Sequence, residues 1–231
     1  MKHIKRIIIV TIIVLTSICL LFINSGYQMY KKAIKEVGLT EKVAQIKEKE
    51  NYTKLSEMPE IYLDAVIAVE DHRFYNHNGI DMISIGRAAF NDIRTLSFIE
   101  GGSTITQQLS KNVYFTQEKK IERKIAEVFM AFTFEEHYTK NEILELYLNT
   151  AYFGNGYYTV KEASQGYFDK EPKEMSDGEA IMLAGIPNAP SVYNPKVNLK
   201  LAKQRRNQVI KKMVKYKKLT QEEANKIIAE N

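Results

Sequence analysis

Two polar segments carry the side chains of this chain that are best suited to chemistry. Residues 100–112 read EGGSTITQQLSKN, and residues 70–77 read EDHRFYNH directly after an apolar run. A pair of glycines gives a flexible backbone, and the hydroxyl and amide side chains that follow offer many hydrogen-bonding groups. Such a run is poor core material, so we expect it to bind a polyhydroxylated or phosphorylated ligand.

Glu70 is the first candidate for acid–base chemistry. It follows the apolar residues 65–69, which places it at the end of a predicted buried helix. Burial and the negative C-terminal end of a helix both favour the protonated carboxyl, as suits a general base. The alternative is a carboxylate that only ends a core helix at the surface, and from the residues alone this is the commoner case.

A second charged group consists of Arg123, Lys124 and Glu127. Glu127 lies four residues after Arg123 and three after Lys124, so the three side chains can meet on one side of a helix. The group fits a basic wall of a ligand site, and it equally fits an exposed ion pair worth only ~0.3–0.5 kcal/mol. The spacing does not decide between these two interpretations.

Five segments together resemble, in order, the motifs of the family 51 peptidoglycan glycosyltransferases. They are residues 70–77, 100–112, 123–127, 149–168 with its Tyr-Phe-Gly at 152–154, and 184–190 with Tyr-Asn-Pro at 193–195. The resemblance covers about residues 65–195. It implies a mainly α fold, with a lysozyme-like helical lobe beside a smaller, membrane-associated lobe.

The resemblance also implies roles for individual residues. Glu70 would take the proton of the attacking hydroxyl, and Glu127 would orient the donor pyrophosphate or its metal ion. The implied contacts to donor sugar and phosphate come from Arg87, Ser103, Thr104, Gln107, Gln108, Lys111, Lys119, Arg123 and Lys124. Lys119 stands where related sequences often carry arginine, and lysine loses the bidentate fork. Ser103 or Thr104 also fits a helix cap, which is compatible with anion binding.

The expected cofactors are few. The resemblance implies no organic cofactor and leaves open a Mg²⁺ or Mn²⁺ ion at the donor pyrophosphate. Asp71, His72 and His77 do not predict a zinc site, because the five-residue gap between the histidines suits neither face of a helix and no further ligand cluster follows.

Helical patterns dominate the chain. A helix is predicted over residues 61–69, and an amphipathic one from Ile121, whose apolar face comprises Ile121, Ile125, Val128, Phe129 and Phe132. Capping-box patterns at residues 139–142, 176–179 and 220–223 predict three more helix starts. Alternating apolar and polar residues, as in strands, are nearly absent.

The N-terminus predicts a membrane anchor. Residues 7–23 are 17 residues without a charge, or about 25 Å of helix at ~1.5 Å per residue. Lys5 and Arg6 can extend the span by snorkelling, and the basic start places the N-terminus in the cytoplasm. A cleaved signal peptide is the alternative, but no Ala-x-Ala site follows. We expect Cys19 to be a lipid-facing side chain within the span.

Charge is unevenly distributed. Without the three basic residues ahead of the apolar run, 30 basic residues face 28 acidic ones, and ten of the basic residues fall within residues 196–218, which contain no acidic residue. The remainder is acidic, which excludes a generally basic nucleic-acid binder. We expect a solvated helix over residues 196–218, with attraction to anionic polymers or lipid as the weaker interpretation.

The predicted organisation is a cytoplasmic N-terminus (residues 1–6), an anchor (7–23), a juxtamembrane stalk without catalytic residues (24–58) and a glycosyltransferase domain (59–231). The resemblance implies an inverting polymerisation of lipid II into β-1,4-linked glycan on the outer face of the bacterial cell membrane, with release of undecaprenyl pyrophosphate. Ser-x-x-Lys and Lys-Thr-Gly are absent, so no transpeptidase is expected.

Further expectations concern partners and alternatives. The resemblance also implies that the segment between the first two motifs dips into the outer leaflet; its apolar residues include Met82, Phe90 and Phe98. The implied partners are lipid II, the growing strand, the cytoplasmic membrane and, beyond these, transpeptidases or division proteins. The alternatives are a lysozyme-like lytic transglycosylase or glycoside hydrolase, and a catalytically inactive membrane scaffold.

Overall fold

The computed structural model describes residues 2–95, 102–116, 118 and 120–229. Eleven α-helices, and no strand, occur in these ranges: α1 Lys2–Glu36, α2 Leu39–Lys47, α3 Glu60–Glu70, α4 Met82–Thr95, α5 Ile105–Tyr114, α6 Ile121–His137, α7 Lys140–Leu148, α8 Val160–Phe168, α9 Asp177–Gly185, α10 Leu199–Lys215 and α11 Gln221–Ala229. Single 3₁₀ turns lie at Leu55–Glu57, Phe74–Asn76, Pro172–Glu174 and Ile186–Asn188. The mainly α prediction is confirmed.

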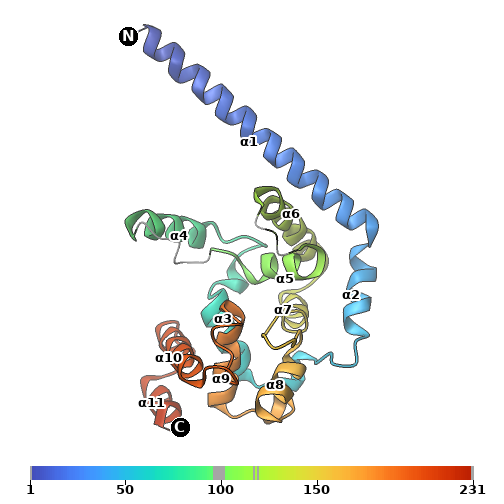
Figure 1. Cartoon of the computed structure of the whole chain (residues 1–231), viewed down its shortest axis with the longest axis vertical. Helices are drawn as coiled ribbons and strands as arrows, with labels where there is room; N and C mark the ends of the chain where they lie inside the picture. The colour runs from blue at the N-terminus through green and yellow to red at the C-terminus, as the bar shows by residue number, and fades with distance from the viewer. Residues whose placement is uncertain (1, 96–101, 117, 119, 230–231) are drawn as a thin grey trace.

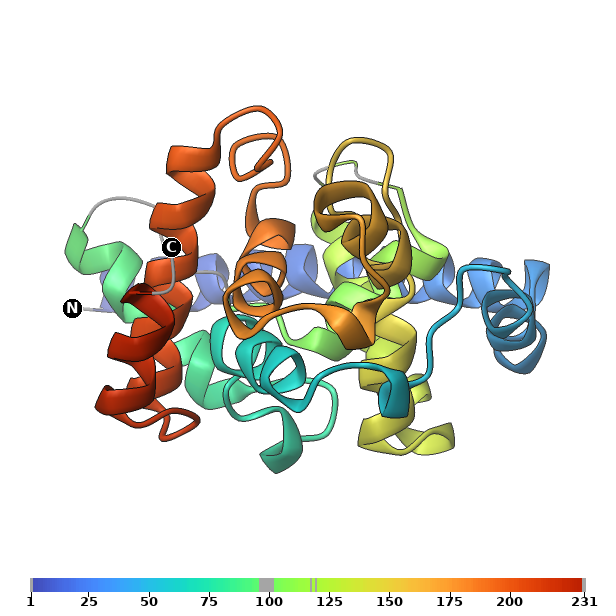
Figure 2. The same cartoon turned by 90° about the horizontal axis from the view of Figure 1, so that it is seen from below.

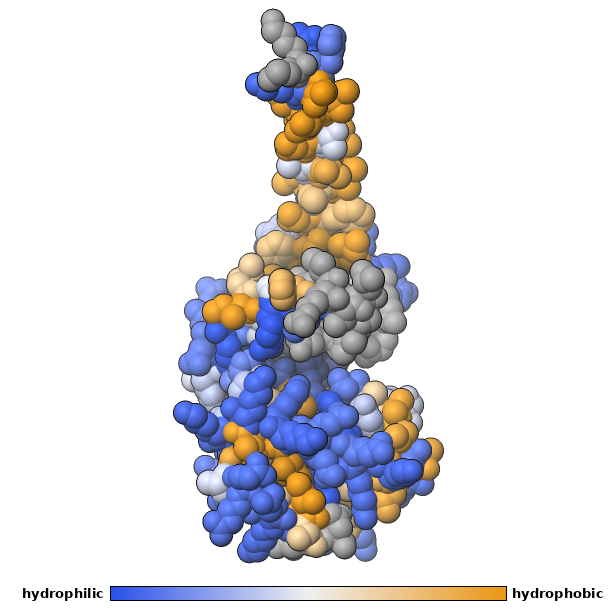
Figure 3. Space-filling view, turned by 90° about the vertical axis from the view of Figure 1, so that its left-hand side faces the viewer, coloured by the Kyte–Doolittle hydropathy of each residue, from blue (hydrophilic) through white to orange (hydrophobic). Residues whose placement is uncertain are grey.

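Helix α1 projects from the body as a long rod (Figure 1). It is the one helix of the described chain that is long and apolar enough to cross a membrane, and its apolar window is not buried by the protein. Its hydrophobic surface stands apart from a body covered largely by hydrophilic side chains on the face shown in Figure 3. The C-terminal part of α1 packs on α6, where Tyr27 and Tyr30 lie against Phe129 with ring centroids 5.2 and 5.9 Å away.

The segment expected to be a stalk packs on the body. Leu39, Val43 and Ile46 of α2 are buried and belong to the same hydrophobic core as the later helices. The Asn149 side chain accepts a hydrogen bond from the Thr53 amide and donates one to the Thr53 carbonyl, both at 2.8 Å. Three apolar residues on one helical face are too sparse a pattern to predict this packing from the sequence.

Two groups of helices form the body. One contains α3, α9, α10 and α11, and the other contains α5, α6 and α7, with α1 lying on α6 (Figures 1 and 2). Large side chains fill the core without exposure, among them Tyr62, Leu109, Phe134, Tyr147 and Phe153. These groups hold the ends of α3 and α5 and the side of α10 close to one another.

The predicted helix starts are confirmed. The hydroxyls of Thr139 and Ser176 accept hydrogen bonds from the third amide of α7 and α9. In return the carboxylates of Glu142 and Glu179 accept from the backbone amides of Thr139 and Ser176. Thr220 and Glu223 form the same reciprocal pair before α11.

The predicted apolar face of α6 is a surface toward α1 rather than toward the domain core. Ile125 and Phe129 of that face lie against Gly26 and Tyr27 of α1. Ile121 and Phe132 are 61% and 41% exposed. The core side of α6 is made by Ala126, Met130 and Phe134, all fully buried. The helix is therefore apolar on two sides, because it lies between the body and α1.

Helix α4 extends away from the body (Figure 1) and exposes apolar side chains. Met82, Ile83 and Phe90 are 67%, 62% and 66% exposed. Phe98, expected to share this surface, lies outside the described residues.

Candidate active site

A cleft of about 550 Å³ lies where the C-terminal end of α3, the start of α5, α4 and α10 approach one another. Its lining comes from segments 68–72, 81–91, 102–111, 187–188 and 205–216. Six of the residues expected to act on or bind the substrate line it, namely Glu70, Arg87, Ser103, Thr104, Gln108 and Lys111. Segments far apart in the sequence thus converge on one polar hollow.

Glu70 is the last residue of α3 and one of its carboxylate oxygens has no partner. Oε2 accepts a hydrogen bond of 2.8 Å from Nε2 of Gln108. Oε1 is buried, and no hydrogen-bond donor of the described residues reaches it. Buried polar atoms are almost always hydrogen-bonded, so this oxygen is open to a hydrogen bond from water or from a ligand hydroxyl in the cleft.

The orientation of Gln108 is set by Tyr147. The hydroxyl of Tyr147 donates to Oε1 of Gln108 at 3.3 Å, which leaves Nε2 of the amide to donate to Glu70. Burial and the charge of Glu70 raise the pKa of Tyr147 well above its ordinary value, so this hydroxyl keeps its proton. Tyr147 comes from α7 and was not among the residues expected in the site.

Asp71 connects the end of α3 to the start of α5. Its buried carboxylate contacts Nε2 of His77 at 2.9 Å and accepts a hydrogen bond of 3.1 Å from the backbone amide of Ile105. The first amide of α5 is therefore satisfied by a residue next to Glu70. This bond fixes the relative position of the first two sequence motifs.

Thr104 caps α5. Its hydroxyl accepts a hydrogen bond from the Gln107 backbone amide and donates one to the Gly79 carbonyl. Oε1 of Gln107 in turn accepts a hydrogen bond from the Thr104 backbone amide. Gln107 is 3% exposed and does not line the cleft. Its side chain is used in the capping box, whereas those of Ser103 and Gln108 face the cleft.

A cationic group lies beside Ser103. Glu127 is 1% exposed and pairs with Nη1 of Arg123 through one carboxylate oxygen and with Nζ of Lys124 at 2.9 Å through the other. Nζ of Lys124 also donates to the Ser103 hydroxyl at 2.6 Å. The spacing of these residues was also compatible with an exposed ion pair. Because Glu127 is buried, that interpretation does not hold.

The basic groups depress one another's proton affinity. Burial, and then the charges of Arg123 and Lys111, lower the pKa of the Lys124 ammonium to about 8. Burial and Arg123 also lower the pKa of Lys111, and Glu70 opposes that shift. Clustered cations at the edge of a cleft favour a polyanionic ligand. Lys119 lies outside the described residues.

Helix α10 contributes basic side chains to the cleft, although the sequence suggested a solvated helix. Arg205, Lys212 and Lys215 line the hollow. Nζ of Lys212 donates to the Val69 carbonyl at 3.1 Å, directly before Glu70. The sequence signal for these basic side chains was the run at residues 196–218, which contains no acidic residue. Only the packing of α10 on α3 shows that the run lies beside Glu70.

His72, Asp81 and Arg87 complete the rim. The His72 ring stacks on Tyr216 with centroids 4.0 Å apart, and burial together with the Arg87 charge lowers the pKa of His72. Burial disfavours the Asp81 carboxylate, but hydrogen bonds from the hydroxyl and amide of Ser84 hold its pKa below the ordinary value. Nη2 of Arg87 approaches the Ser84 hydroxyl at 3.5 Å.

The donor set does not fit a metal ion held by the protein. Within the described ranges no three His, Cys, Asp or Glu side chains gather where they could hold one. Both oxygens of Glu127, the acidic residue nearest the cations, are already bound by Arg123 and Lys124.

Comparison with known proteins assigns the chain to a family. The sequence profile of the Transglycosylase family matches residues 38–214, which is most of the chain. The chain therefore belongs to the transglycosylase family, the glycosyltransferase family 51 domain of class A penicillin-binding proteins.

Two relatives agree with the family match. Penicillin-binding protein 1A of Vibrio cholerae is 39% identical over 249 aligned positions, covering all of this chain and 30% of that protein. Penicillin-binding protein 1F of Bacillus subtilis is 47% identical over 156 positions, covering 68% of this chain and 22% of that protein. The crystal structure of penicillin-binding protein 1A from Haemophilus influenzae superposes with a TM-score of 0.47 and 26% identity, over 78% of this chain and 17% of that one. The chain thus spans less than a third of these relatives' length.

Proposed function

We propose that this chain is a peptidoglycan glycosyltransferase that joins lipid II into β-1,4-linked strands and releases undecaprenyl pyrophosphate. The single observation that carries the proposal is the unpartnered Oε1 of Glu70 in a cleft flanked by cations. A base and positive charge for a leaving pyrophosphate are the two groups that this reaction requires. Family membership supports the reaction class.

In the proposed reaction Glu70 takes the proton of the 4-hydroxyl of the acceptor N-acetylglucosamine. The oxygen attacks C1 of the donor N-acetylmuramic acid from the face opposite the leaving group. The bond from C1 to the pyrophosphate oxygen breaks, its electron pair leaves with the pyrophosphate, and the configuration at C1 inverts. Gln108 and Tyr147 hold the Glu70 carboxylate in place through the bonds described above.

Two basic groups would serve the two lipid-linked substrates. Lys111, Arg123 and Lys124 stabilise the charge that develops on the donor pyrophosphate, with Ser103 positioned by Lys124. Lys212 and Lys215 lie on the α10 side of Glu70, where they can hold the anionic part of the acceptor. Arg87 and Lys119 belong to the proposal as further phosphate contacts. A Mg²⁺ or Mn²⁺ ion, if needed, would have to be held by the pyrophosphate itself.

We propose that α1 anchors the enzyme with its N-terminus in the cytoplasm and the cleft outside, because basic residues precede the apolar run. The exposed apolar side chains of α4 would contact the outer leaflet. Transpeptidases or division proteins stay expected partners on the strength of the family alone.

A glycoside hydrolase fits the site less well. Hydrolysis by two carboxylates needs a second acid free to act at the sugar. Glu127 is buried and bound by two cations. The other carboxylates that line the cleft with Glu70 are also engaged: Asp71 by His77 and the Ile105 amide, and Asp81 by Arg73 and Ser84. A catalytically inactive scaffold would not account for the unpartnered oxygen of Glu70.

The proposed function is tested by measuring whether the protein converts lipid II into polymer. The purified full-length protein in detergent is incubated with lipid II, and the products are separated by size before and after lysozyme digestion. We expect a lysozyme-digestible polymer from the wild type and none from Glu70→Gln. Release of free disaccharide from preformed glycan, without polymer from lipid II, would support the hydrolase; no reaction of either kind would support the scaffold.

A further inference from the structure

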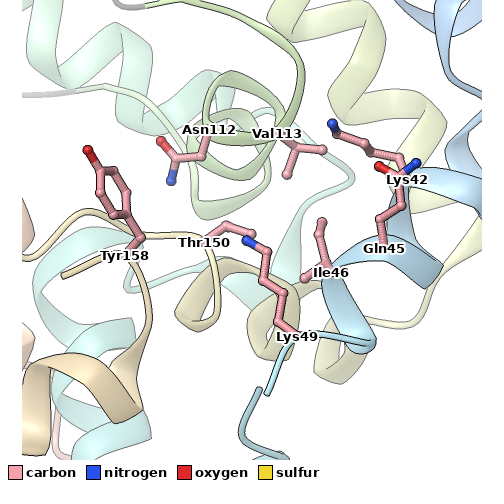
Figure 4. Close-up of a pocket in the computed structure, with 8 residues that line it drawn as sticks. All are labelled: Lys42, Gln45, Ile46, Lys49, Asn112, Val113, Thr150 and Tyr158. Atoms are coloured by element: carbon pink, nitrogen blue, oxygen red, sulfur yellow. The ribbon is translucent and has the colours of Figure 1, made fainter. Parts of the chain in front are cut away.

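A second cavity of about 210 Å³ lies between α2, the C-terminal end of α5 and the loop that follows α7. Figure 4 shows Lys42, Gln45 and Lys49 entering it from the α2 side, with Asn112 and Tyr158 at the other end. Ile46 and Val113 supply its apolar surface. The cavity is separate from the cleft that contains Glu70 and shares no lining residue with it.

The cavity is positively charged. Its lining contains two lysines and no acidic residue. Among the described residues no carboxylate lies within 4.0 Å of Nζ of Lys42 or Lys49, whereas Lys140, Lys170 and Lys218 elsewhere on the body each pair with one. In Figure 4 the Lys49 ammonium points across the hollow toward Thr150. Two uncompensated ammonium groups at a concave surface favour an anionic ligand.

The remaining polar groups suit a carbohydrate. The Asn112 side chain offers an amide for which no described residue provides a hydrogen-bond partner. The Thr150 hydroxyl at the rim donates to the Leu146 carbonyl, so it offers a ligand only an acceptor. Tyr158 is 56% exposed and its ring lies 4.8 Å from that of Tyr152. An exposed aromatic pair beside amide and hydroxyl groups provides both an apolar face and hydrogen bonds for a sugar ring.

Helix α5 connects the two hollows. Gln108 and Lys111 line the cleft, and Asn112 and Val113 line the second cavity. Asn112 lies four residues after Gln108, which is about 6 Å along the helix axis. A polymer that leaves the cleft along α5 therefore reaches the second cavity within a short distance.

We propose that this cavity is a subsite for the glycan strand, in which Lys42 and Lys49 receive carboxylates of the strand's peptide side chains while Asn112, Thr150 and Tyr158 contact the sugar. The inference rests on the proposed function, because it assigns the ligand as the substrate or product of that reaction. It gives the α2 segment, expected to be a passive stalk, a role in holding the strand.

A lipid headgroup is the competing anionic ligand, and the position of α2 disfavours it. The apolar run ends at residue 23, and α1 continues to Glu36 before α2 begins. Thirteen further residues correspond to about 20 Å of helix. For a helix along the bilayer normal this exceeds the ~5–8 Å of a headgroup layer. The second cavity therefore lies beyond the zone where lipid phosphates are expected.

The experiment compares strand lengths made by full-length protein from lipid II in neutral detergent. The test variant is Lys42→Gln/Lys49→Gln, and the matched control is Lys47→Gln, which alters an exposed lysine of the same helix that lies outside the cavity. We expect the double variant to make strands about two- to fivefold shorter at equal conversion, since exposed ion pairs contribute weakly. The control should match the wild type, and thermal unfolding of all three should coincide.

Two further arms identify the ligand. With lipid II whose stem-peptide carboxylates are amidated, wild type and double variant should make strands of equal length. If the double variant matches the wild type with unmodified lipid II, the inference is wrong. It is also wrong if the defect persists with amidated lipid II, or appears only in vesicles that contain anionic lipid. A wild type that makes no polymer would instead contradict the proposed function itself.

Discussion

Gly26 of α1 lies directly against Ile125 of α6, so that a methyl group at position 26 would meet the Ile125 side chain at 2.6 Å and the Glu122 carbonyl at 2.8 Å. The hydroxyl of Tyr30, one turn further along, contacts that of Thr133 at 2.9 Å. Because α6 also carries Arg123, Lys124 and Glu127, the helix that is long and apolar enough to cross a membrane packs on the helix that carries the cations beside the cleft.

This contact predicts that Gly26→Leu displaces α1 from α6. We expect lower activity and a lower midpoint of thermal unfolding, since overpacking at a tight contact commonly costs about 1–3 kcal/mol. Gly38→Ala is the matched control, because nothing lies within 4 Å of a methyl group at position 38. Wild-type activity and unfolding temperature in the Gly26→Leu protein would show that the contact is not needed.

Glu70→Gln should abolish polymerisation while the protein still folds. The amide keeps the shape of the side chain but cannot take the proton, and general-base catalysis is typically worth ~10²–10⁴ in rate. The initial rate with lipid II measures the loss, and circular dichroism checks the fold. A rate within threefold of the wild type would remove Glu70 from the mechanism.

Lys111→Ala and Arg123→Ala should each reduce turnover far more than Lys173→Ala. The first two residues belong to the cationic group at the cleft, where charge stabilisation of a leaving group can be worth about 3 kcal/mol. Lys173 is exposed on a distant turn and serves as the control. Small and equal losses in all three variants would contradict a role for these cations in departure of the pyrophosphate.

The low pKa of Lys124 predicts a pH dependence. Below about pH 8 its ammonium is charged, and above that value it progressively loses the proton. Turnover should therefore fall as the pH rises through 8, and Lys124→Arg, if active, should keep its rate because guanidinium stays charged. An identical fall in both proteins would assign the titration elsewhere.

Stability should respond in the opposite sense. The pKa of Lys124 is lower in the folded chain than in the unfolded one, so the unfolded chain binds more protons between about pH 8 and 10.5. This group therefore raises the free energy of unfolding as the pH increases through that window. A loss of activity above pH 8 would thus not be explained by unfolding through Lys124.

Phe90→Ser should weaken binding to liposomes in a protein that begins at Tyr27. Phe90 is 66% exposed on α4, and burying a phenylalanine stabilises by about 1.5–3 kcal/mol, so we expect at least about tenfold weaker partitioning. Val197→Ser is the control, because Val197 is 75% exposed but lies outside α4. Equal cosedimentation of both variants and the parent would show that Phe90 does not contact the bilayer. A parent that does not cosediment at all would leave the apolar run of α1 as the membrane contact.

The sequence by itself determined the local features. Apolar spacing and capping residues predicted the helices that begin at Glu60, Ile121, Lys140, Asp177 and Gln221, because helix periodicity and caps are properties of neighbouring residues. The motifs also predicted Glu70, Ser103, Gln108 and Lys111 as residues of one site, and the cleft contains all four.

The tertiary structure decided what depends on long-range packing. The spacing of Arg123 and Glu127 is the same in an exposed ion pair and in a buried one, and only the folded chain buries Glu127. The sequence motif suggested that the Gln107 amide binds ligand, whereas in the folded chain this side chain accepts a hydrogen bond from the Thr104 amide at the N-cap of α5. Lys212 joins the cleft because α10 packs on α3, and Lys42 faces a cavity because α2 packs on the body. Periodicity specifies which face of a helix is apolar, but the partner that covers the face is set by segments far away in the chain.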